Sequence, residues 1–406
     1  MSAGSVVMYV KRARKTKVAH RKLVIAFLAN FFIPLAGIST DIYLPSLPAL
    51  SAHYATSHAM VQYTVVTFTL GMGLMQFIAG PVSDALGRRK LLLAALIVQF
   101  ITIVLILVIP SITWMILLRF IQGAAAAFMI VPARALLNDV FSADQLKKQF
   151  NYTTISFALG PILGPFIGSY LQLYFGWHAN FIFILGYAFL ALMFVLFLLP
   201  ETIASTHRFS MSHLWKNYGC IIQNKAFVVT CALTACMPAA NMLFTVAGSF
   251  IIQKSLHYSV IMYGRMSLVI GFAWFLGNLL NRLLFSIPEK IKVRVGLSIA
   301  VVTAIIMLLF SIAGYFTLIL FVIPTFIMVV VGGGLFSLFV SNSLSKFSDL
   351  AASANGFLFS ITWIGFSVFT LIASTISTTS LISLSSVLVA AYLLSMLLAL
   401  LRRHVH

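Results

Sequence analysis

About a dozen apolar stretches follow one another along nearly the whole chain, and each is long enough to cross a lipid bilayer. A spanning helix needs about 20 mostly apolar residues, and the polar connections here are mostly short. The chain is 61% hydrophobic and only 8% charged, which is more apolar surface than a soluble domain can bury. We therefore expect an all-α membrane protein.

The apolar pattern predicts twelve transmembrane helices in two bundles of six. The predicted spans are 23–45, 59–82, 91–110, 112–138, 148–175, 178–200, 223–252, 259–286, 294–312, 315–342, 351–375 and 378–401. The longest polar connection, 201–222, separates the two sets and is the predicted linker. The expected domains are thus the bundles 23–200 and 223–401, flanked by a basic N-terminus at 1–22 and a short C-terminus at 402–406.

Basic residues dominate the polar connections and give the chain a net charge of +19. They gather in alternate connections, on one side of the predicted membrane. Positive charge marks the cytoplasmic side. We expect both termini and the 201–222 linker in the cytoplasm of a bacterial inner-membrane protein. The same distribution favours anionic lipid, and not nucleic acid, as the partner of these charges.

Three cysteines, Cys220, Cys231 and Cys236, are close together in the sequence, but no histidine stands at a metal-ligand spacing beside them. We interpret them as packing residues and expect neither a disulfide nor a metal site. No phosphate-binding loop is present in the sequence, and no nucleophile and base are predicted at one depth. An enzyme and a cofactor are therefore not expected.

Asp41 is the one acidic residue of seven that falls inside a predicted span. A carboxylate inside a membrane is costly and is by default a candidate functional residue. Asn30, Pro34, Gly37 and Asp41 are spaced 4, 3 and 4 residues apart, so they share one helical face. This face is smaller and more polar than the rest of the helix, as expected for a cavity lining.

Four sequence motifs occur in a characteristic order. They are Ser39–Pro48 in the first span, the basic turn Gly80–Lys90, Arg119–Gly123 in the fourth span and Gly160–Gly168 in the fifth. The last three resemble motifs A, B and C of the major facilitator superfamily. The first resembles the first helix of Bcr/CflA-type drug:proton antiporters, and Gly176-Trp177 and Pro200-Glu201 fit the same pattern. The resemblance is strong through residue 201 and weak after it.

This resemblance implies a twelve-helix fold of two bundles and a set of functional residues. The motif A residues are Gly80, Asp84, Gly87, Arg88 and Arg89, and the motif C residues are Gly160, Pro161, Gly164, Pro165 and Gly168. Motif A glycines permit close packing and a sharp reversal of the chain. Motif C prolines and glycines are expected to break up the fifth helix, which would pack against the second bundle.

The inner gate is expected to consist of Asp84 and Arg134, with Ser348 or Asp349 at the start of the eleventh helix. The resemblance places Asp84 near the positive N-terminus of the eleventh helix, where a negative charge is stabilising. We hypothesise that this contact holds the outward-facing state.

The sequence departs from the family pattern at three places. Ala85 follows Asp84 where a basic residue is usual, and the fifth span has Gly-Pro pairs where Bcr/CflA relatives often have Ala-Pro. Ile33 and Pro34 stand where some multidrug relatives carry a second acid. These changes weaken the expectation of broad cationic-drug recognition.

Arg119 is the expected partner of Asp41, because the two residues differ in depth by roughly 5 Å at 1.5 Å per residue along their helices. An ion pair would offset part of the cost of burying both charges. One interpretation is a static salt bridge between the first and fourth helices. The other is proton coupling, in which Asp41 gains and loses a proton as its pairing changes and substrate competes for it.

Other polar and aromatic residues within the predicted spans are candidates for the lining of a substrate cavity. With the Asp41 face they make the set Asn30, Pro34, Gly37, Tyr43, Gln122, Asn241, Trp274, Asn278, Asn355 and Trp363. For the Asn and Trp residues of the second bundle, packing between helices is an equally good explanation.

The predicted function is proton-coupled export of small molecules by alternating access, as a drug-type efflux antiporter and a monomer. Two alternatives stay open. One is export of an endogenous hydrophilic metabolite such as a siderophore or an amino acid. The other is a membrane sensor or scaffold of the same fold that transports nothing.

Overall fold

The computed structural model describes residues 3–203, 210–344, 347, 350–375 and 380–404. Eleven helices within these ranges are long and apolar enough to cross a membrane. A further helix, α6 (Ala143–Phe175), lies where the fifth span is predicted. The expectation of an all-α membrane protein is confirmed.

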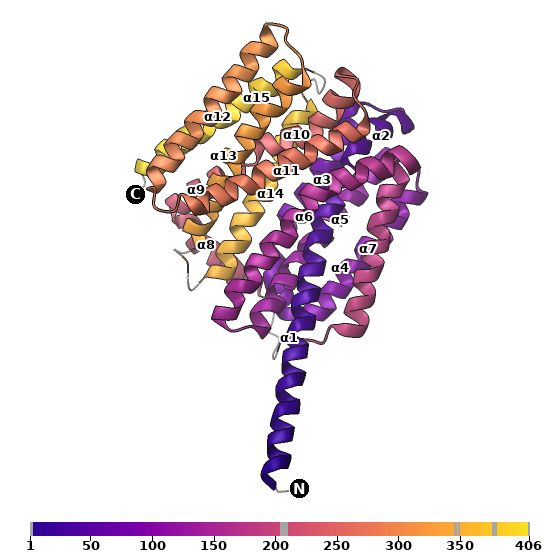
Figure 1. The fold of residues 1–406 in the computed structure, drawn as a ribbon, viewed down its shortest axis with the longest axis vertical. Helices are drawn as coiled ribbons and strands as arrows, with labels where there is room; N and C mark the ends of the chain where they lie inside the picture. The colour runs from indigo at the N-terminus through magenta and orange to yellow at the C-terminus, as the bar shows by residue number, and fades with distance from the viewer. Residues whose placement is uncertain (1–2, 204–209, 345–346, 348–349, 376–379, 405–406) are drawn as a thin grey trace.

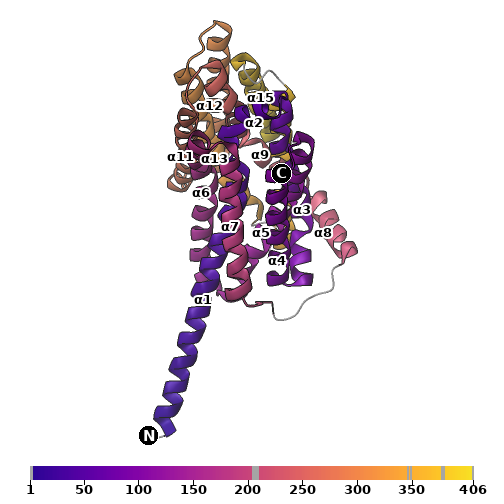
Figure 2. The ribbon, with the colours of Figure 1, turned by 90° about the vertical axis from the view of Figure 1, so that its right-hand side faces the viewer.

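The first half of the chain forms one group of helices, drawn in indigo to magenta in Figure 1. Its elements are α1 (Ala3–Asp41), a short 3₁₀ turn (Leu44–Ser46), α2 (Leu47–His53), α3 (His58–Leu86), α4 (Arg88–Val108), α5 (Ile112–Val140), α6 and α7 (Trp177–Leu198). The N-terminal part of α1 projects well beyond the other helices in both views (Figures 1 and 2).

The second half forms the group drawn from pink through orange to yellow (Figure 1). Its elements are α8 (Met211–Gln223), α9 (Lys225–Cys236), α10 (Ala239–Phe250), a π-helical turn (Ile251–Ser255), α11 (Val260–Leu283), α12 (Glu289–Ile312), α13 (Leu318–Leu344), α14 (Ala351–Thr375) and α15 (Leu381–His404). We call the end of the molecule that carries α2 the α2 end. The opposite end, which carries the turn between α3 and α4, is the basic end.

Two predicted segments differ from the observed elements. The predicted linker 201–222 contains most of a helix, α8, which hydropathy alone does not reveal. The predicted span 223–252 is divided into α9 and α10 at Met237 and Pro238. Pro238 lacks an N–H group and so removes one hydrogen bond of the helical ladder at this point. Gly332 of α13 packs against this point, where a Cβ atom would lie 2.3 Å from the Met237 carbonyl oxygen.

Helix α6 is continuous from Ala143 to Phe175, with Pro161 and Pro165 inside it. The expectation that motif C breaks up this helix is therefore wrong. Its glycines serve close packing instead. A Cβ atom on Gly160 would lie 2.9 Å from the Gly37 Cα, and one on Gly168 would lie 1.7 Å from the Ile42 carbonyl oxygen. The backbones of α6 and α1 touch because these side chains are absent.

The opposite side of α6 contacts α11 of the second group, as the sequence predicts for motif C. A Cβ atom on Gly264 would meet the Ser169 side chain, and one on Gly271 would meet Ile162. Helix α6 is thus packed between α1 and α11, so it couples the helix that ends at Asp41 to the second half of the protein.

Further contacts join the two groups at the α2 end and along α3 and α14. Gln253 Nε2 donates to the Pro45 carbonyl at 2.9 Å, and the rings of His58 and Phe250 lie 4.3 Å apart. Ser367 of α14 donates to the carbonyl of Val66 in α3 at 3.0 Å. The two groups are therefore in contact at the α2 end.

Helix α8 contacts the first group although the chain connects it directly to α9. The buried Tyr218 hydroxyl donates to the Phe77 carbonyl of α3 at 2.5 Å. Its ring packs against Phe77 and against Phe357 of α14. Burial raises the pKa of Tyr218 to about 12, so the hydroxyl keeps the proton that it donates throughout the neutral range.

The α1–α6 contact predicts that the loss of stability on replacing a glycine depends strongly on where the glycine lies. Gly168→Ala is expected to lower the free energy of unfolding by about 1–3 kcal/mol, because the methyl group overlaps the Ile42 carbonyl oxygen. Gly186→Ala in α7 is the matched control, since a Cβ atom there meets nothing within 4 Å. Thermal unfolding in detergent measures both variants, and equal midpoints would contradict this packing.

Candidate functional site

Arg119 of α5 is completely buried and lies between two aromatic rings. Its guanidinium carbon is 4.5 Å from the centre of the Tyr43 ring and 4.3 Å from that of Phe68. Nη1 donates to the Ser39 carbonyl at 2.8 Å and to Gln122 Oε1 at 2.9 Å. Nε and Nη2 are buried and have no hydrogen-bond partner among the described residues. Arg119 therefore holds unused donor capacity inside the protein.

Asp41 is the last residue of α1 and is only 7% exposed. The position that a Cβ atom on Gly164 would take is 3.4 Å from the Asp41 Cβ, so α6 backs this carboxylate. Asp41 interacts electrostatically with Arg119 and Tyr43 of its own group and with Tyr263 of α11. It thus lies where the two groups of helices meet.

The expected direct ion pair between Asp41 and Arg119 is absent from the ion pairs that the described residues form. The two groups attract one another electrostatically, but the Arg119 Nη1 hydrogens go to a carbonyl and an amide oxygen. Arg119 Nη1 is instead bonded to neutral acceptors on α1 and α5. The result is a buried acid and a buried cation that are neighbours without a bond.

The polar face of α1 is used in part for packing against α6. Asn30 accepts a hydrogen bond from Ser156 at 3.1 Å and donates to the Ala26 carbonyl at 2.8 Å. Gly37 meets Gly160, and Pro34 is buried. Of the residues on this face, Asp41 is the one whose polar group stays without a hydrogen bond among the described residues.

Two further candidates of the first half, Tyr43 and Gln122, complete the surroundings of Arg119. The Tyr43 hydroxyl is 2.9 Å from Thr64 Oγ1, and the ring faces the guanidinium. Gln122 is buried one helical turn after Arg119 and accepts its hydrogen bond. The sequence identified these residues as cavity candidates, and the structure places them against Arg119.

Tyr263 is a residue of this region that the sequence does not indicate. It is fully buried on α11, and its hydroxyl donates to the Thr245 carbonyl at 2.7 Å. A tyrosine within an apolar span has no spacing signal that would single it out. Its importance follows only from the packing of α11 against α6, which brings it near Asp41.

The candidates of the second half are spread over several contacts. Trp274 packs on Phe336, and Asn278 donates to the Trp274 carbonyl at 2.8 Å within α11. Trp363 packs on Phe366. These three residues have contacts that account for them as packing groups.

Asn355 and Asn241 differ from the other second-half candidates. The Oδ1 atom of Asn355 is buried with no hydrogen-bond partner among the described residues. Asn241 is half-buried on α10. Asn355 therefore offers an acceptor on α14.

The motif A turn at the basic end is closed by Gly87, whose φ of +90° lies in the region that favours glycine. This agrees with a sharp reversal of the chain. Gly80 is different, because a Cβ atom on it would meet nothing within 4 Å. The expectation that Gly80 serves close packing is wrong for this structure.

Arg88 ties the turn to two acids of its own group. Nη1 donates to Asp84 Oδ1 at 2.5 Å and Nε to Asp139 Oδ2 at 3.3 Å. Arg89 reaches the C-terminal end of α7, where Nη2 donates to the Leu196 carbonyl at 2.8 Å. Asp84 therefore pairs within the first group of helices.

The remaining gate candidates are Arg134 and Asp349. The Arg134 guanidinium lies 5.2 Å from the centre of the Phe359 ring of α14, so it contacts the second group. Asp349 and its alternative Ser348 lie outside the described residues.

Glu201 has a structural role that the sequence did not assign. Its carboxylate accepts the backbone N–H groups of Arg88 at 3.0 Å and Arg89 at 3.2 Å, at the start of α4. The first N–H groups of a helix have no partner within the helix, and a negative charge there is favourable. Thr202 next to it donates to Asp139 at 2.6 Å.

A buried acid beside a buried arginine, at the junction of two helical groups that span a membrane, is an arrangement typical of a multi-pass secondary transporter.

The family follows from comparison with known proteins. The model of the Major Facilitator Superfamily matches residues 27–373, so the chain belongs to this superfamily. The "Bicyclomycin resistance protein homolog" of Haemophilus influenzae is 38% identical over 168 residues, which are 41% of this chain and 42% of that protein. The "Multidrug transporter MdfA" of Yersinia pestis is 26% identical over 286 residues, which are 69% and 70% of the two chains.

The match to the Haemophilus protein spans less than half of that protein's length. A solved structure, the crystal structure of a D-xylose–proton symporter, superposes with a TM-score of 0.73 at 14% identity. It covers 92% of this chain and 97% of that chain, and it supports the fold alone.

The role of Glu201 can be measured without a substrate. Glu201→Ala is expected to cost about 0.5–2 kcal/mol of stability, as removal of other N-terminal helix caps does. Hydrogen exchange at the Arg88 and Arg89 amides is expected to accelerate, because both lose their acceptor. Glu201→Gln keeps one acceptor oxygen and is expected to fall between wild type and Glu201→Ala. Unchanged exchange at both amides in Glu201→Ala would refute this role.

Proposed function

We propose that this protein is a proton-coupled exporter of small molecules, with Asp41 as the proton carrier. The observation that carries the proposal is the buried Asp41 carboxylate, which forms no ion pair among the described residues and lies next to an arginine with unused donors. A static salt bridge between α1 and α5 would need the ion pair that is absent here. An acid without a fixed partner is free to exchange a proton.

Proton exchange would work through the charge balance around Asp41. Deprotonated Asp41 is attracted to Arg119, and protonation of Asp41 removes this attraction. Tyr263 lies on the second group of helices, so a movement of that group changes the surroundings of Asp41. Protonation and the relative position of the two groups would thereby be linked.

The substrate class proposed first is drug-type, by analogy with the printed names of the relatives from Haemophilus and Yersinia. The second candidate is an endogenous hydrophilic metabolite such as a siderophore or an amino acid. The free Nε and Nη2 of Arg119 favour it, since they suit an acidic or carbonyl group of a substrate. A sensor or scaffold that transports nothing is the alternative of another class.

We place the protein in the bacterial inner membrane with its basic end, both termini and α8 in the cytoplasm, following the distribution of Lys and Arg. The units that move would be residues 23–200 and 223–401 within a monomer, with 201–222 as the connection. Asp84 would leave Arg88 and approach the N-terminal end of α14 when the α2 end opens.

Transport in proteoliposomes with an imposed pH difference tests the proton carrier. Wild-type protein is expected to accumulate substrate only when the pH difference is imposed, in a screen of bicyclomycin, other antibiotics, dyes and iron chelators. Asp41→Asn is expected to reduce this accumulation to the level of empty liposomes, because the amide binds no proton.

Asp41→Glu is the matched control, since it keeps a titratable carboxyl and is expected to retain a dependence on the pH difference. Unchanged elution and thermal unfolding show that each variant is folded. Coupling retained in Asp41→Asn would overturn the assignment of the carrier. Binding of ligand without any flux in the wild type would favour the sensor or scaffold.

Alternating access predicts that the contact at the α2 end opens in each cycle. In a background without Cys220, Cys231 and Cys236, a bis-methanethiosulfonate cross-link between His58→Cys and Phe250→Cys is expected to stop transport, and a reductant, which cleaves the link, is expected to restore it. Each single cysteine variant is the control. If Asp84 holds the open state, Asp84→Asn raises the yield of this cross-link, and an equal yield would contradict the gate.

A further inference from the structure

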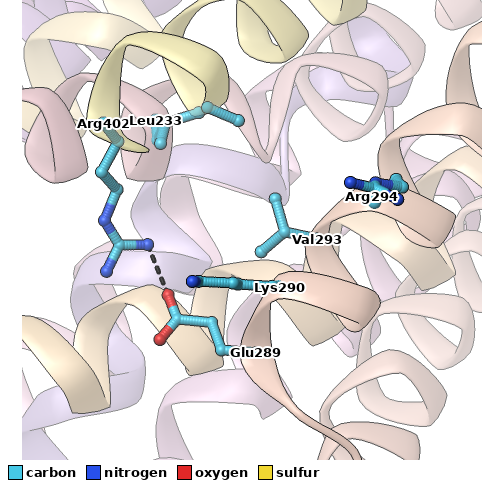
Figure 3. Close-up of a pocket in the computed structure, with 7 residues that line it drawn as sticks. Leu233, Glu289, Lys290, Val293, Arg294 and Arg402 are labelled. Carbon is cyan, nitrogen blue, oxygen red and sulfur yellow. Dashed lines mark hydrogen bonds and ion pairs between the residues drawn. The ribbon is translucent and has the colours of Figure 1, made fainter. Parts of the chain in front are cut away.

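A pocket of about 470 Å³ lies in the second group of helices, between α9, α12 and α15 (Figure 3). Its apolar wall is made of Leu233, Val293 and Ala399. It lies where α12 begins and α15 ends, at the basic end of the molecule, whereas Asp41 lies at the α2 end of α1. The pocket is therefore separate from the site proposed for proton coupling.

The charged residues of the pocket are one acid and three cations. Glu289 is fully engaged, because Oε1 pairs with Arg402 and Oε2 accepts from Asn342 Nδ2 at 2.7 Å. Lys290 and Arg294 form no ion pair among the described residues. In Figure 3 the Lys290 side chain points toward the bonded pair of Glu289 and Arg402, and Arg294 lies beyond Val293. The pocket thus keeps an excess of positive charge.

A polar atom within the pocket also lacks a partner. Arg402 Nε is buried and has no hydrogen bond among the described residues, while Nη1 of the same group is held by Glu289. The guanidinium lies 5.5 Å from the centre of the Phe339 ring. A buried donor without an acceptor is unfavourable, and an anionic oxygen in the pocket would satisfy it.

Helices α12 and α15, which line the pocket, also carry exposed apolar residues at this end of the molecule. They include Ile291, Val295, Leu397 and Leu401. In a membrane-spanning protein such a surface faces acyl chains. A ligand with a negative head and apolar tails therefore matches the cations of the pocket, its apolar wall and the apolar surface of these two helices.

We propose that this pocket binds the phosphodiester headgroup of an anionic phospholipid. Lys290 and Arg294 neutralise the phosphate, Arg402 Nε donates to one of its oxygens, and the acyl chains lie along α12 and α15. Basic pockets between transmembrane helices on the cytoplasmic side suit such headgroups. The bound lipid would tie α12 to α15 and stabilise the second group of helices.

Native mass spectrometry of the full chain tests this site with phosphatidylglycerol and, for comparison, phosphatidylcholine. Wild-type protein is expected to retain phosphatidylglycerol and to lose phosphatidylcholine. K290Q/R294Q is expected to weaken retention of phosphatidylglycerol at least about tenfold, because it removes two cations from the headgroup. K216Q/R282Q is the matched control, since it removes one exposed Lys and one exposed Arg elsewhere.

If K290Q/R294Q and K216Q/R282Q lost phosphatidylglycerol equally, the binding would be a general attraction to acidic lipid, and the proposal would be overturned.

A second measurement separates the lipid from a free anion. Phosphatidylglycerol is expected to raise the thermal midpoint of the wild type and of K216Q/R282Q, whereas inorganic phosphate is expected to have no effect. An equal rise with phosphate alone would replace the lipid by a soluble anion and refute the proposed ligand.

Discussion

The contact of α6 with the end of α1 fixes the position of everything else around Asp41. Gly160, Gly164 and Gly168 bring the α6 backbone against α1, and the other face of α6 lies on α11. Small residues at spacing four are what close approach of membrane helices requires. The acid is thereby held on a firmly packed helix, and its surroundings are completed by α5 on one side and α11 on the other.

Burial of two charges without a bond between them is the cost that this arrangement carries. Arg119 is stabilised by Ser39, Gln122 and two aromatic faces, so its charge is tolerated without a carboxylate. Because these groups stabilise the Arg119 charge, the Asp41 carboxylate is not needed to balance it. A tight ion pair with Arg119 would keep Asp41 charged. An arginine that is close but not bonded shifts the equilibrium between protonated and charged Asp41 without fixing it.

Much of this organisation could be predicted from the sequence, because long apolar runs and motif spacing are strong signals. The spans, Asp41, Arg119 and the glycines of α6 are examples. Hydropathy could not reveal the interruption at Pro238 or the helix α8, since neither changes the mean apolarity enough. The partner of Arg119 could not be predicted either, because nearby carbonyl and amide oxygens compete with a carboxylate and only coordinates rank them. Tyr263 and Glu201 act through contacts between distant segments, which no local pattern records.

Helix α8 has a consequence for the speed of any movement between the two groups. Asn224 alone separates it from α9, so it travels with the second half of the chain, yet Tyr218 is bonded to Phe77 of the first. The bond must break and re-form whenever these halves separate at the basic end. A bond made in only one arrangement stabilises that arrangement and adds to the barrier for leaving it, so the connection between the two halves would itself slow and bias the movement.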